Sequence, residues 1–335
     1  MKIYLFCFFS VVIIILFFFS SCNKVDEKNF CTPQVYTLQP VKISDSQAVF
    51  RANCILDKKK FELVFEWKKV SENGLSTVKQ NATHGVCSFP IENLEEDTEY
   101  TVRALMIDIH GDTLYGENIG FRTHGTMQDI DGNTYLTMRY GNKVFMTENL
   151  RVTRYSDGTK LVARSGVVNN FTDGPAYYYS SAHSVFLKNP NYGLLYNWAA
   201  ALRVEDCQTS PPSGSNTTIQ GICPEGWHIP SISEYGEITY HYRGYQMKTE
   251  NWSLDSKYTI NNYSQFSAEP SGFYHVDSGE IDKCFNMVGR GTLFMSRNQG
   301  DEYMVYTILL LYREKDINVY PTFKSIGVSV RCVKD

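Results

Sequence analysis

Residues 221–231 read GICPEGWHIPS and place a cysteine, a histidine, a tryptophan, two glycines and two prolines in eleven positions. Proline fixes the backbone φ angle, and glycine adopts turn conformations that other residues avoid. Directly after the second proline, Ser231 and Glu234 have the S-x-x-E spacing of a capping box, which predicts a helix that runs toward His241. The stretch therefore predicts a stiff loop that enters a helix, with Trp227 buried.

The same stretch raises the question of an active site, because a cysteine and a histidine can act as nucleophile and base. A catalytic cysteine needs its base within hydrogen-bond reach, whereas His228 stands five residues after Cys223 across two stiffened turns. The spacings H-x-x-x-H and H-E-x-x-H, which are typical of zinc sites, do not occur in the sequence. We therefore expect both residues to be structural, and we expect no enzymatic activity, no metal and no cofactor.

Upstream, residues 32–123 contain short runs rich in Val, Ile, Phe and Tyr, separated by polar turns, which predict a β-sandwich. The segment LEEDTEY, from Leu94 to Tyr100, is more specific. A leucine, an acidic turn and a Thr-x-Tyr that opens a strand resemble the tyrosine corner of fibronectin type III domains, where the tyrosine hydroxyl bonds back to the turn. This resemblance implies an all-β, fibronectin type III-like first domain.

Two cysteines of this region, Cys54 and Cys87, fall on strands that we expect to be neighbours in one sheet. An exported chain permits disulfides, so a cross-strand bond between them is one interpretation. Two separate buried thiols are the other, because free cysteine behaves as a small apolar residue.

Downstream, a series of motifs follows in a fixed order. They are DIDGNTY (129–135), YGLLYNW (192–198), the CPEGWHIP of the opening stretch, FSAEPSG (266–272) and SVRCV (329–333). In this order they resemble the Fibrobacter succinogenes major paralogous domain, which occurs in secreted and lipidated proteins of Bacteroidetes and their relatives. The resemblance covers residues 129–335 and implies a second domain at 124–335.

Three places depart from the pattern of that family. Phe145 stands where the family has tryptophan, and Glu269 replaces a residue that is usually apolar. The block FMSR (294–297) replaces a segment with aromatic and serine residues. Because this block lies late in the domain, its change would alter any ligand surface there.

The ending G-x-x-V-R-C also resembles C-type-lectin-like folds and their formylglycine-generating relatives, in which a late strand returns to early structure and a disulfide ties it down. This resemblance implies an α+β, lectin-like second domain with a disulfide between Cys223 and Cys332. The chain-entropy model gives about 4–5 kcal/mol for closing a loop of about 110 residues. Cys207 and Cys284 are the other predicted pair, although four cysteines allow three connectivities.

Three residues are candidates for ligand binding. Tyr177 and Tyr179 share one face of a predicted strand, where their rings would suit stacking on a sugar; plain packing is the alternative. Glu269 begins a Glu-Pro-Ser triplet that is similar to the Glu-Pro-Asn loop of calcium-dependent lectins. Coincidence is the alternative there, because no Trp-Asn-Asp motif follows.

Asp129, Asp131 and Asn133 have the spacing of the first ligands in a calcium loop. The EF-hand pattern would next require a glycine and later a closing glutamate, and the sequence has Thr134 and Tyr140 at those places. We therefore expect a hairpin turn here.

The sequence opens with MKIYLFCFFSVVIIILFFFSSC, in which one lysine precedes a long apolar run and two serines precede Cys22. This is typical of a secretory signal whose small residues before a cysteine resemble a bacterial lipobox. We expect a leader at 1–21, lipidation of Cys22, and a tether at 22–31. The protein would then be an exported outer-membrane lipoprotein that faces the cell surface or the periplasm; an uncleaved membrane anchor is the alternative.

The formal net charge of −4, without a long basic run, argues against nucleic acid as a partner. The combination of a lipid anchor with two such domains favours a function in adhesion, with a glycan or a protein as ligand. A structural component of a surface assembly is the alternative, and an enzyme related to the formylglycine-generating folds is less favoured. The sequence does not specify the ligand or the oligomeric state.

Overall fold

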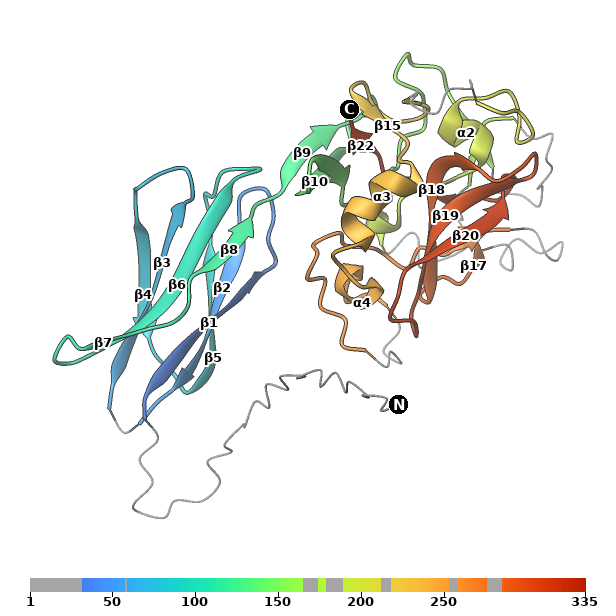
Figure 1. Cartoon of the computed structure of the whole chain (residues 1–335). Coiled ribbons are helices and arrows are strands. Elements are labelled where there is room, and N and C mark those ends of the chain that lie inside the picture. The colour runs from blue at the N-terminus through green and yellow to red at the C-terminus, as the bar shows by residue number, and fades with distance from the viewer. Residues whose placement is uncertain are drawn as a thin grey trace, which may run out of the picture.

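The computed structural model describes residues 32–57, 59–164, 174–178, 189–211, 218–252, 258–275 and 285–335. These residues form mostly β-strands, arranged in several sheets with few helices (Figure 1). Within them, no helix has the length and apolar character needed to cross a bilayer. The expected leader (1–21) and tether (22–31) lie outside the described residues, as do Tyr179 and Cys284, so their assignments remain predictions.

The first part of the chain is a sandwich of two sheets. In β2 (Ala48–Ile55) every second residue is buried, so Phe50, Ala52 and Cys54 face the opposite sheet. Phe50 forms the centre of this core, with its ring centroid 6.0 Å from that of Phe65 and 5.5 Å from that of Phe121. One sheet has the order β1 (Gln34–Val41), β2 (Ala48–Ile55) and β5 (Gly85–Ile91). The other has the order β4 (Ser76–Asn81), β3 (Phe61–Lys69), β6 (Glu99–Asp108) and β7 (Thr113–Tyr115), and β8 (Ile119–Arg122) also pairs with β6.

The turn before β6 is closed by a tyrosine. The hydroxyl of Tyr100 accepts a hydrogen bond of 2.9 Å from the backbone N–H of Glu95, and Leu94 is buried beneath the turn. The ring of Tyr100 stacks on Phe121 of β8 with centroids 5.4 Å apart. The hydrogen bond predicted from LEEDTEY is therefore confirmed.

The cross-strand disulfide between Cys54 and Cys87 is not formed, and the alternative of two buried free thiols holds. Register explains this outcome: Cys54 is opposite Gly85, and Cys87 is opposite Ala52, so the two cysteines are diagonal neighbours. Diagonal Cα atoms in a sheet are about 7–8 Å apart, beyond the range of most disulfides. Burial, together with the neighbouring Cys87, raises the pKa of the Cys54 thiol to about 12.

The second domain is built around two sheets that the last strands complete. β21 (Val328–Ser329) pairs with β14 (Leu195–Tyr196) and β18 (Gly291–Gln299) in the larger sheet. β22 (Val333–Lys334) pairs with β11 (Lys143–Met146) and β15 (Trp227–His228) in the smaller one. The predicted return of a late strand to early structure is thus present. The smaller sheet has the order β15 (Trp227–His228), β22 (Val333–Lys334), β11 (Lys143–Met146), β10 (Thr134–Tyr140) and β9 (Gly125–Gln128). The larger has the order β12 (Val162–Arg164), β13 (Ala176–Tyr178), β14 (Leu195–Tyr196), β21 (Val328–Ser329), β18 (Gly291–Gln299), β19 (Met304–Leu311) and β20 (Asn318–Phe323).

Helices are short and lie around these sheets (Figure 1). They are the 3-10 helix Pro190–Tyr192, α2 (Trp198–Leu202), α3 (Ile232–Thr239) and α4 (Gly244–Met247). A further pair of strands, β16 (Phe273–Tyr274) and β17 (Phe285–Asn286), forms a small sheet of its own. Within the described residues, the second domain therefore contains more strand than helix.

The stretch 221–231 folds as its sequence predicts. Cys223 is bonded to Cys332, and Trp227 is buried in β15 against β22. Ser231 caps α3 with its side chain, and Glu234 returns the bond to the Ser231 backbone, which completes the capping box. Gly221 is required because its φ is +57° and a Cβ there would meet a backbone oxygen of α2 at 1.9 Å. The stretch is scaffold.

The expected hairpin at DIDGNTY joins β9 to β10. The carboxylate of Asp129 accepts hydrogen bonds from the backbone N–H groups of Asp131 and Asn133, at 2.9 and 3.0 Å. It also accepts one from the hydroxyl of Tyr135 at 2.6 Å. The carboxylate of Asp129 therefore fixes the turn through these hydrogen bonds.

Replacing both Cys223 and Cys332 with serine is expected to lower the free energy of unfolding by about 4–5 kcal/mol, because the disulfide spans 109 residues. Urea denaturation of both chains measures the difference. A reductant should bring the wild type to the stability of the double variant and leave the variant unchanged. Equal midpoints for the two oxidised chains would contradict a stabilising role.

Candidate functional site

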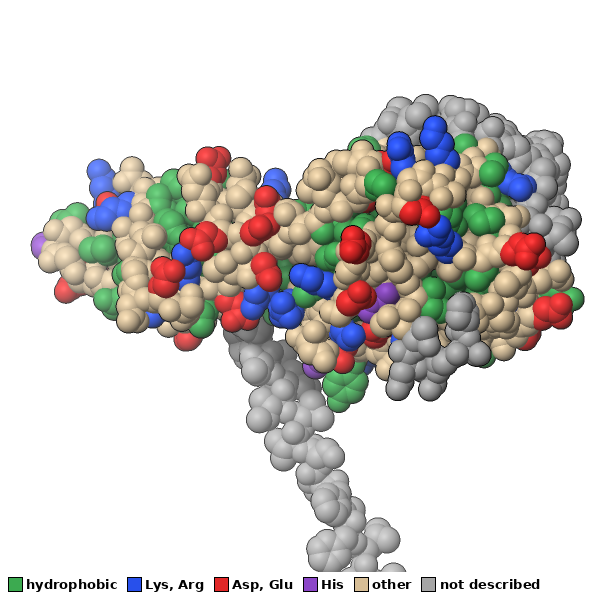
Figure 2. All heavy atoms as spheres, turned by 90° about the horizontal axis from the view of Figure 1, so that it is seen from above, with side chains coloured by type: hydrophobic (Ala, Val, Ile, Leu, Met, Phe, Trp, Pro, Cys, Tyr) green, Lys and Arg blue, Asp and Glu red, His purple; other side chains and the backbone are tan. Residues whose placement is uncertain are grey.

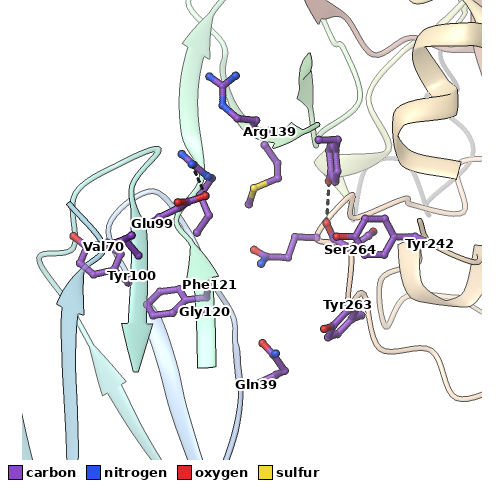
Figure 3. Close-up of a pocket in the computed structure, with 14 residues that line it drawn as sticks. Gln39, Val70, Glu99, Tyr100, Gly120, Phe121, Arg139, Tyr242, Tyr263 and Ser264 are labelled. Carbon is purple, nitrogen blue, oxygen red and sulfur yellow. Dashed lines mark hydrogen bonds and ion pairs between the residues drawn. The ribbon is translucent and has the colours of Figure 1, made fainter. Parts of the chain in front are cut away.

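A groove of about 380 Å³ lies between the sandwich and the second domain (Figure 3). Figure 3 shows Tyr242 and Tyr263 on the side of the second domain, opposite Tyr100 and Phe121 of the sandwich. This volume is near the lower end of the 300–1,000 Å³ usual for small-ligand sites. Both halves of the molecule thus contribute to one concave surface.

The wall formed by the second domain has an unusual backbone. Three non-glycine residues of the segment 262–267 have positive φ: Asn262 at 44°, Gln265 at 58° and Ser267 at 54°. Left-handed conformations are costly for residues with a Cβ, and they collect at ligand clamps and active sites. Within this segment, Tyr263 keeps 50% of its surface exposed. The strained segment therefore presents an aromatic ring to the groove.

Arg331 fixes the segment 262–267 from its buried side. Its guanidinium donates to the backbone oxygens of Phe266 and Ser267 and, at 2.8 Å, to the side-chain oxygen of Asn149. It is fully buried and lies over the rings of Phe266 and Phe294, 4.3 and 4.9 Å from their centroids. Burial lowers the pKa of Arg331 to about 10, so it remains charged at neutral pH. A buried cation thus fixes the strained wall in place.

The aromatic surface of this wall extends beyond one residue. The ring centroid of Tyr242 lies 6.2 Å from that of Tyr263 and 6.3 Å from that of Tyr140. Tyr140 is buried, and its hydroxyl donates to the backbone oxygen of Ser264 at 3.0 Å. The rings therefore run from the interior to the exposed Tyr263 as one packed series.

The sandwich wall carries paired charges. Arg122 bonds Asp97 at 2.9 Å and Glu99 at 2.8 Å. From the second domain, Arg139 approaches Asp97 at 3.9 Å, and 41% of its side-chain surface is exposed. Gln39 lines the lower part of the groove in Figure 3 and is exposed. The charged groups of the groove are thus largely neutralised by one another.

His124 connects the two walls at the boundary between them. Its backbone N–H donates to Ser44 and its backbone oxygen accepts from Asp97, both in the sandwich. Its Nε2 lies 3.0 Å from Oε1 of Gln265, which lines the other wall. Nδ1 is buried and has no hydrogen-bond partner among the described residues. Burial lowers the pKa of His124 to about 4, against opposing effects of Gln265 and of the nearby charge of Asp45.

The pattern of the Fibrobacter succinogenes major domain matches residues 138–334, more than half of the chain. The chain belongs to this family. Within the matched residues, the segment FSAEPSG supplies Phe266 and Ser267 and the segment SVRCV supplies Arg331, which together position the wall of the groove.

Comparisons beyond the family are limited. No curated protein matches the chain. A solved structure described as "Myokine structure" is 24% identical over 28% of this chain and 98% of that chain, with a TM-score of 0.23. The sensor domain of the anti-sigma factor RsgI4 in Pseudobacteroides cellulosolvens is 11% identical over 28% of this chain and 95% of that chain, with a TM-score of 0.23. Neither likeness supports an inference about function.

The ligand-binding residues expected from the sequence lie elsewhere. Tyr177 is half-buried in β13 and packs against the main core of the second domain. Glu269 is buried, and its carboxylate accepts hydrogen bonds from Thr249 at 3.0 Å and from Asn251 at 3.0 and 3.1 Å. Its carboxylate therefore supports internal loops, and its expected role as a ligand residue stays a prediction. Tyr179 lies outside the described residues.

The altered block FMSR (294–297) is also not a ligand surface. Phe294, Met295 and Ser296 are buried in β18, and Phe294 is one of the two rings that contact Arg331. Phe145, the other aromatic departure, is buried between Tyr140 and Tyr235. These departures from the family pattern therefore change the core. Cys207 is buried, and its expected pairing with Cys284 is untested.

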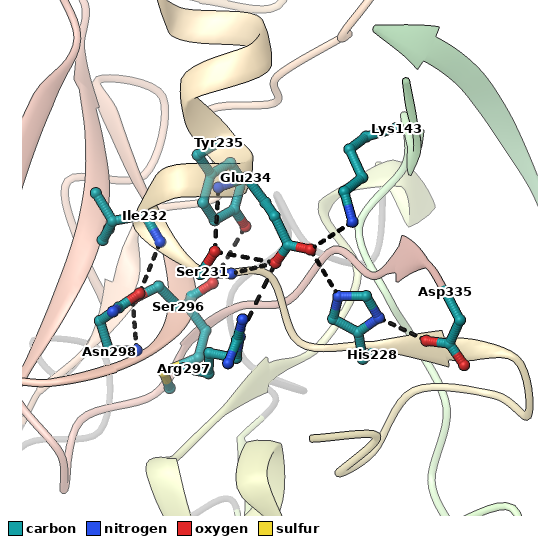
Figure 4. Close-up of polar contacts among 11 residues, drawn as sticks. Lys143, His228, Ser231, Ile232, Glu234, Tyr235, Ser296, Arg297, Asn298 and Asp335 are labelled. Atoms are coloured by element: carbon teal, nitrogen blue, oxygen red, sulfur yellow. Dashed lines mark hydrogen bonds and ion pairs between the residues drawn. The ribbon is translucent and has the colours of Figure 1, made fainter. Parts of the chain in front are cut away.

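His228 belongs to a cluster of charges around the start of α3 (Figure 4). It is 1% exposed, with Nε2 2.9 Å from the carboxylate of Glu234 and Nδ1 2.6 Å from that of Asp335. Burial alone would lower its pKa, but the two carboxylates raise it. Glu234 also accepts from Lys143 at 2.9 Å. Because Cys223 is bonded to Cys332, this cluster has no thiol nucleophile, and it ties α3 to the last strand.

The described residues include no group of three or more His, Cys, Asp or Glu arranged to hold a metal ion. The residues of the groove were missed by sequence reasoning. A weak signal existed: tyrosines are frequent in TYHYRGY (239–245), and NNYSQ (261–265) directly precedes a family motif. Neither segment has a spacing that identifies a site.

Replacing Arg331 with methionine is expected to lower the free energy of unfolding by about 3 kcal/mol or more. The variant would leave two buried oxygens, of Asn149 and Phe266, and the part-buried oxygen of Ser267 without their donor, and a buried oxygen without a donor costs about 1–3 kcal/mol. Urea denaturation measures the change. Arg290 is exposed, so the matched variant Arg290→Met should change stability by about 0.5 kcal/mol or less. Similar small effects for both variants would contradict the role of Arg331.

Lowering the pH should reduce the free energy of unfolding through protonation of His124. Because the pKa of His124 is about 4 in the folded chain, below its ordinary value of 6.5, the unfolded chain binds the proton first as pH falls. The wild type should therefore lose on the order of 3 kcal/mol between pH 6.5 and 4 from this group, and His124→Gln should lack that loss. Denaturation at pH 7 and pH 4.5 measures it. An equal drop in both chains would show that His124 is not responsible.

Proposed function

We propose that the protein is a binding module of the bacterial cell envelope, and that it holds its ligand in the groove between its two domains. The observation that carries this proposal is the strained segment 262–267, which presents Tyr263 to a concave surface shared by both domains. Strain at non-glycine residues persists where function requires a fixed geometry. The ligand is a glycan or a protein.

The architecture supports this proposal. We assign the first domain to the fibronectin type III class, because β1-β2-β5 faces β4-β3-β6 and Tyr100 closes the turn before β6. We assign the second domain to an α+β, C-type-lectin-like fold, because late strands enter both sheets and the Cys223–Cys332 disulfide fastens them. Domains of these kinds present ligand-binding surfaces on a rigid scaffold.

The location proposed is the outer membrane, with lipid on Cys22 after removal of residues 1–21. The short polar stretch up to residue 31 would separate the sandwich from the bilayer. The proposed partners are accordingly a membrane through the lipid anchor and a surface glycan or protein through the groove. The expectation that the protein is not an enzyme is part of this proposal.

A role in a surface assembly is the second candidate, and strand β20 favours it. β20 ends the order of the larger sheet within the described residues, and Val319 and Tyr320 are 52% and 50% exposed. Exposed apolar edge strands pair readily with other chains. Size-exclusion chromatography separates the candidates, because an assembly component forms stable oligomers and a binding module need not.

Filling the groove tests the proposed function. Gly120 lines the groove, and a Cβ there would lie 4.0 Å from its nearest neighbour, the backbone oxygen of Tyr100, so Gly120→Trp can occupy the space without disturbing the core. Gly74 is exposed with nothing within 4 Å of a Cβ, which makes Gly74→Trp the matched control. On arrays of glycans and surface proteins, we expect Gly120→Trp to lose the signals that wild type and Gly74→Trp give. Retention of those signals by Gly120→Trp would overturn the groove as the site.

A further inference from the structure

We infer that the groove binds an uncharged glycan chain through the exposed ring of Tyr263. This inference rests on the proposed function, since it names the ligand class of the same groove. It depends on four properties of the described residues: the aromatic platform, the paired charges, the amide at the rim and the rigidity of the wall.

The aromatic platform favours sugar over other polar ligands. Tyr263 is half exposed, and Tyr242 lies beside it with ring centroids 6.2 Å apart. A tyrosine ring offers a flat apolar face together with a hydroxyl that remains in water. The C–H faces of pyranose rings match such a surface.

The charges of the groove favour a ligand without net charge. Arg122 is held by Asp97 and Glu99, and Arg139 also approaches Asp97. An ionic ligand would have to displace one of these partners, and it would leave that partner's charge unpaired. Across the junction seen from above, acidic and basic side chains are intermixed without a large field of one sign (Figure 2). A neutral ligand avoids this cost.

Hydrogen bonding and size agree with a short stretch of glycan. Gln39 is exposed at the groove, and its amide both donates and accepts, as sugar hydroxyls do. Small-ligand sites usually have volumes of about 300–1,000 Å³, and a groove of about 380 Å³ lies in this range. The groove therefore has the size for a few sugar units.

Contacts within the protein fix the wall formed by residues 262–267 in the absence of a ligand. Arg331 fixes the backbone oxygens of Phe266 and Ser267, and the Asn262 side chain accepts from the Ser267 N–H at 2.9 Å. A ring held in its bound position loses less conformational entropy on binding. Tyr263 thus acts as a positioned platform at the surface of an ordered segment.

The experiment measures binding of neutral hexasaccharides of glucose, mannose and xylose to the full chain in detergent by calorimetry, with hexagalacturonate as the charged comparator. We expect at least one neutral chain to bind more tightly than hexagalacturonate. Tyr263→Ala should weaken that binding at least tenfold, about 1.4 kcal/mol. Tyr263→Phe should retain it, because the ring face is kept. Tyr115→Ala is the control, since Tyr115 is 60% exposed and lies outside the groove.

The outcomes separate this inference from the proposed function. Tighter binding of hexagalacturonate that still depends on Tyr263 would overturn the uncharged ligand and keep the groove as the site. Neutral binding that Tyr263→Ala leaves unchanged would overturn both. Failure of every neutral hexasaccharide to bind at millimolar concentration would overturn the glycan, while loss of array signals in Gly120→Trp would still support the groove. Circular dichroism of each variant confirms that the fold is intact.

Discussion

The structure of the second domain depends on the burial of one positive charge. Arg331 has no exposed surface, and a guanidinium without partners is too costly to keep in a protein interior. Its bonds reach Asn149 from early in the domain and the Phe266 and Ser267 oxygens from its middle. Three distant segments must therefore meet in one geometry before this charge is satisfied.

The network continues from Asn149. Its amide nitrogen donates to the backbone oxygen of Tyr192 at 3.0 Å and to the hydroxyl of Ser329 at 3.2 Å, while its oxygen accepts from Arg331. Ser329 in turn lies 2.8 Å from the hydroxyl of Ser271. The buried polar groups of four segments thus satisfy one another, which specifies a single arrangement of the backbone. The wall of the groove is the exposed end of this arrangement.

Sequence reasoning succeeded where a feature depends on neighbours in the chain. The α3 cap needs only Ser231 and Glu234, and the turn before β6 needs only Glu95 and Tyr100. The Cys223–Cys332 bond was reached through family resemblance, because no local rule connects residues 109 apart.

Sequence reasoning failed where the outcome depends on register or on distant contacts. A difference of two residues in the pairing of β2 with β5 separates Cys54 from Cys87, and no pattern in the sequence specifies it. Glu269 is buried, and its carboxylate accepts hydrogen bonds from Thr249 and Asn251, which precede it by 20 and 18 residues. The groove exists only because two domains meet at His124, so neither domain's sequence pattern alone indicates it.

The pairing of the last strands has a consequence for biosynthesis. The sandwich uses only residues up to 122, so its core is complete once that part of the chain has been made. In the second domain, β11 cannot complete its pairing until Val333 has been made, and β14 cannot complete its pairing until Val328 and Ser329 have been made. These residues come well over a hundred positions later in the chain. Until those residues emerge, both central sheets have unpaired edges, which aggregate readily. During synthesis, the first domain can therefore fold early while the second still needs protection from other chains.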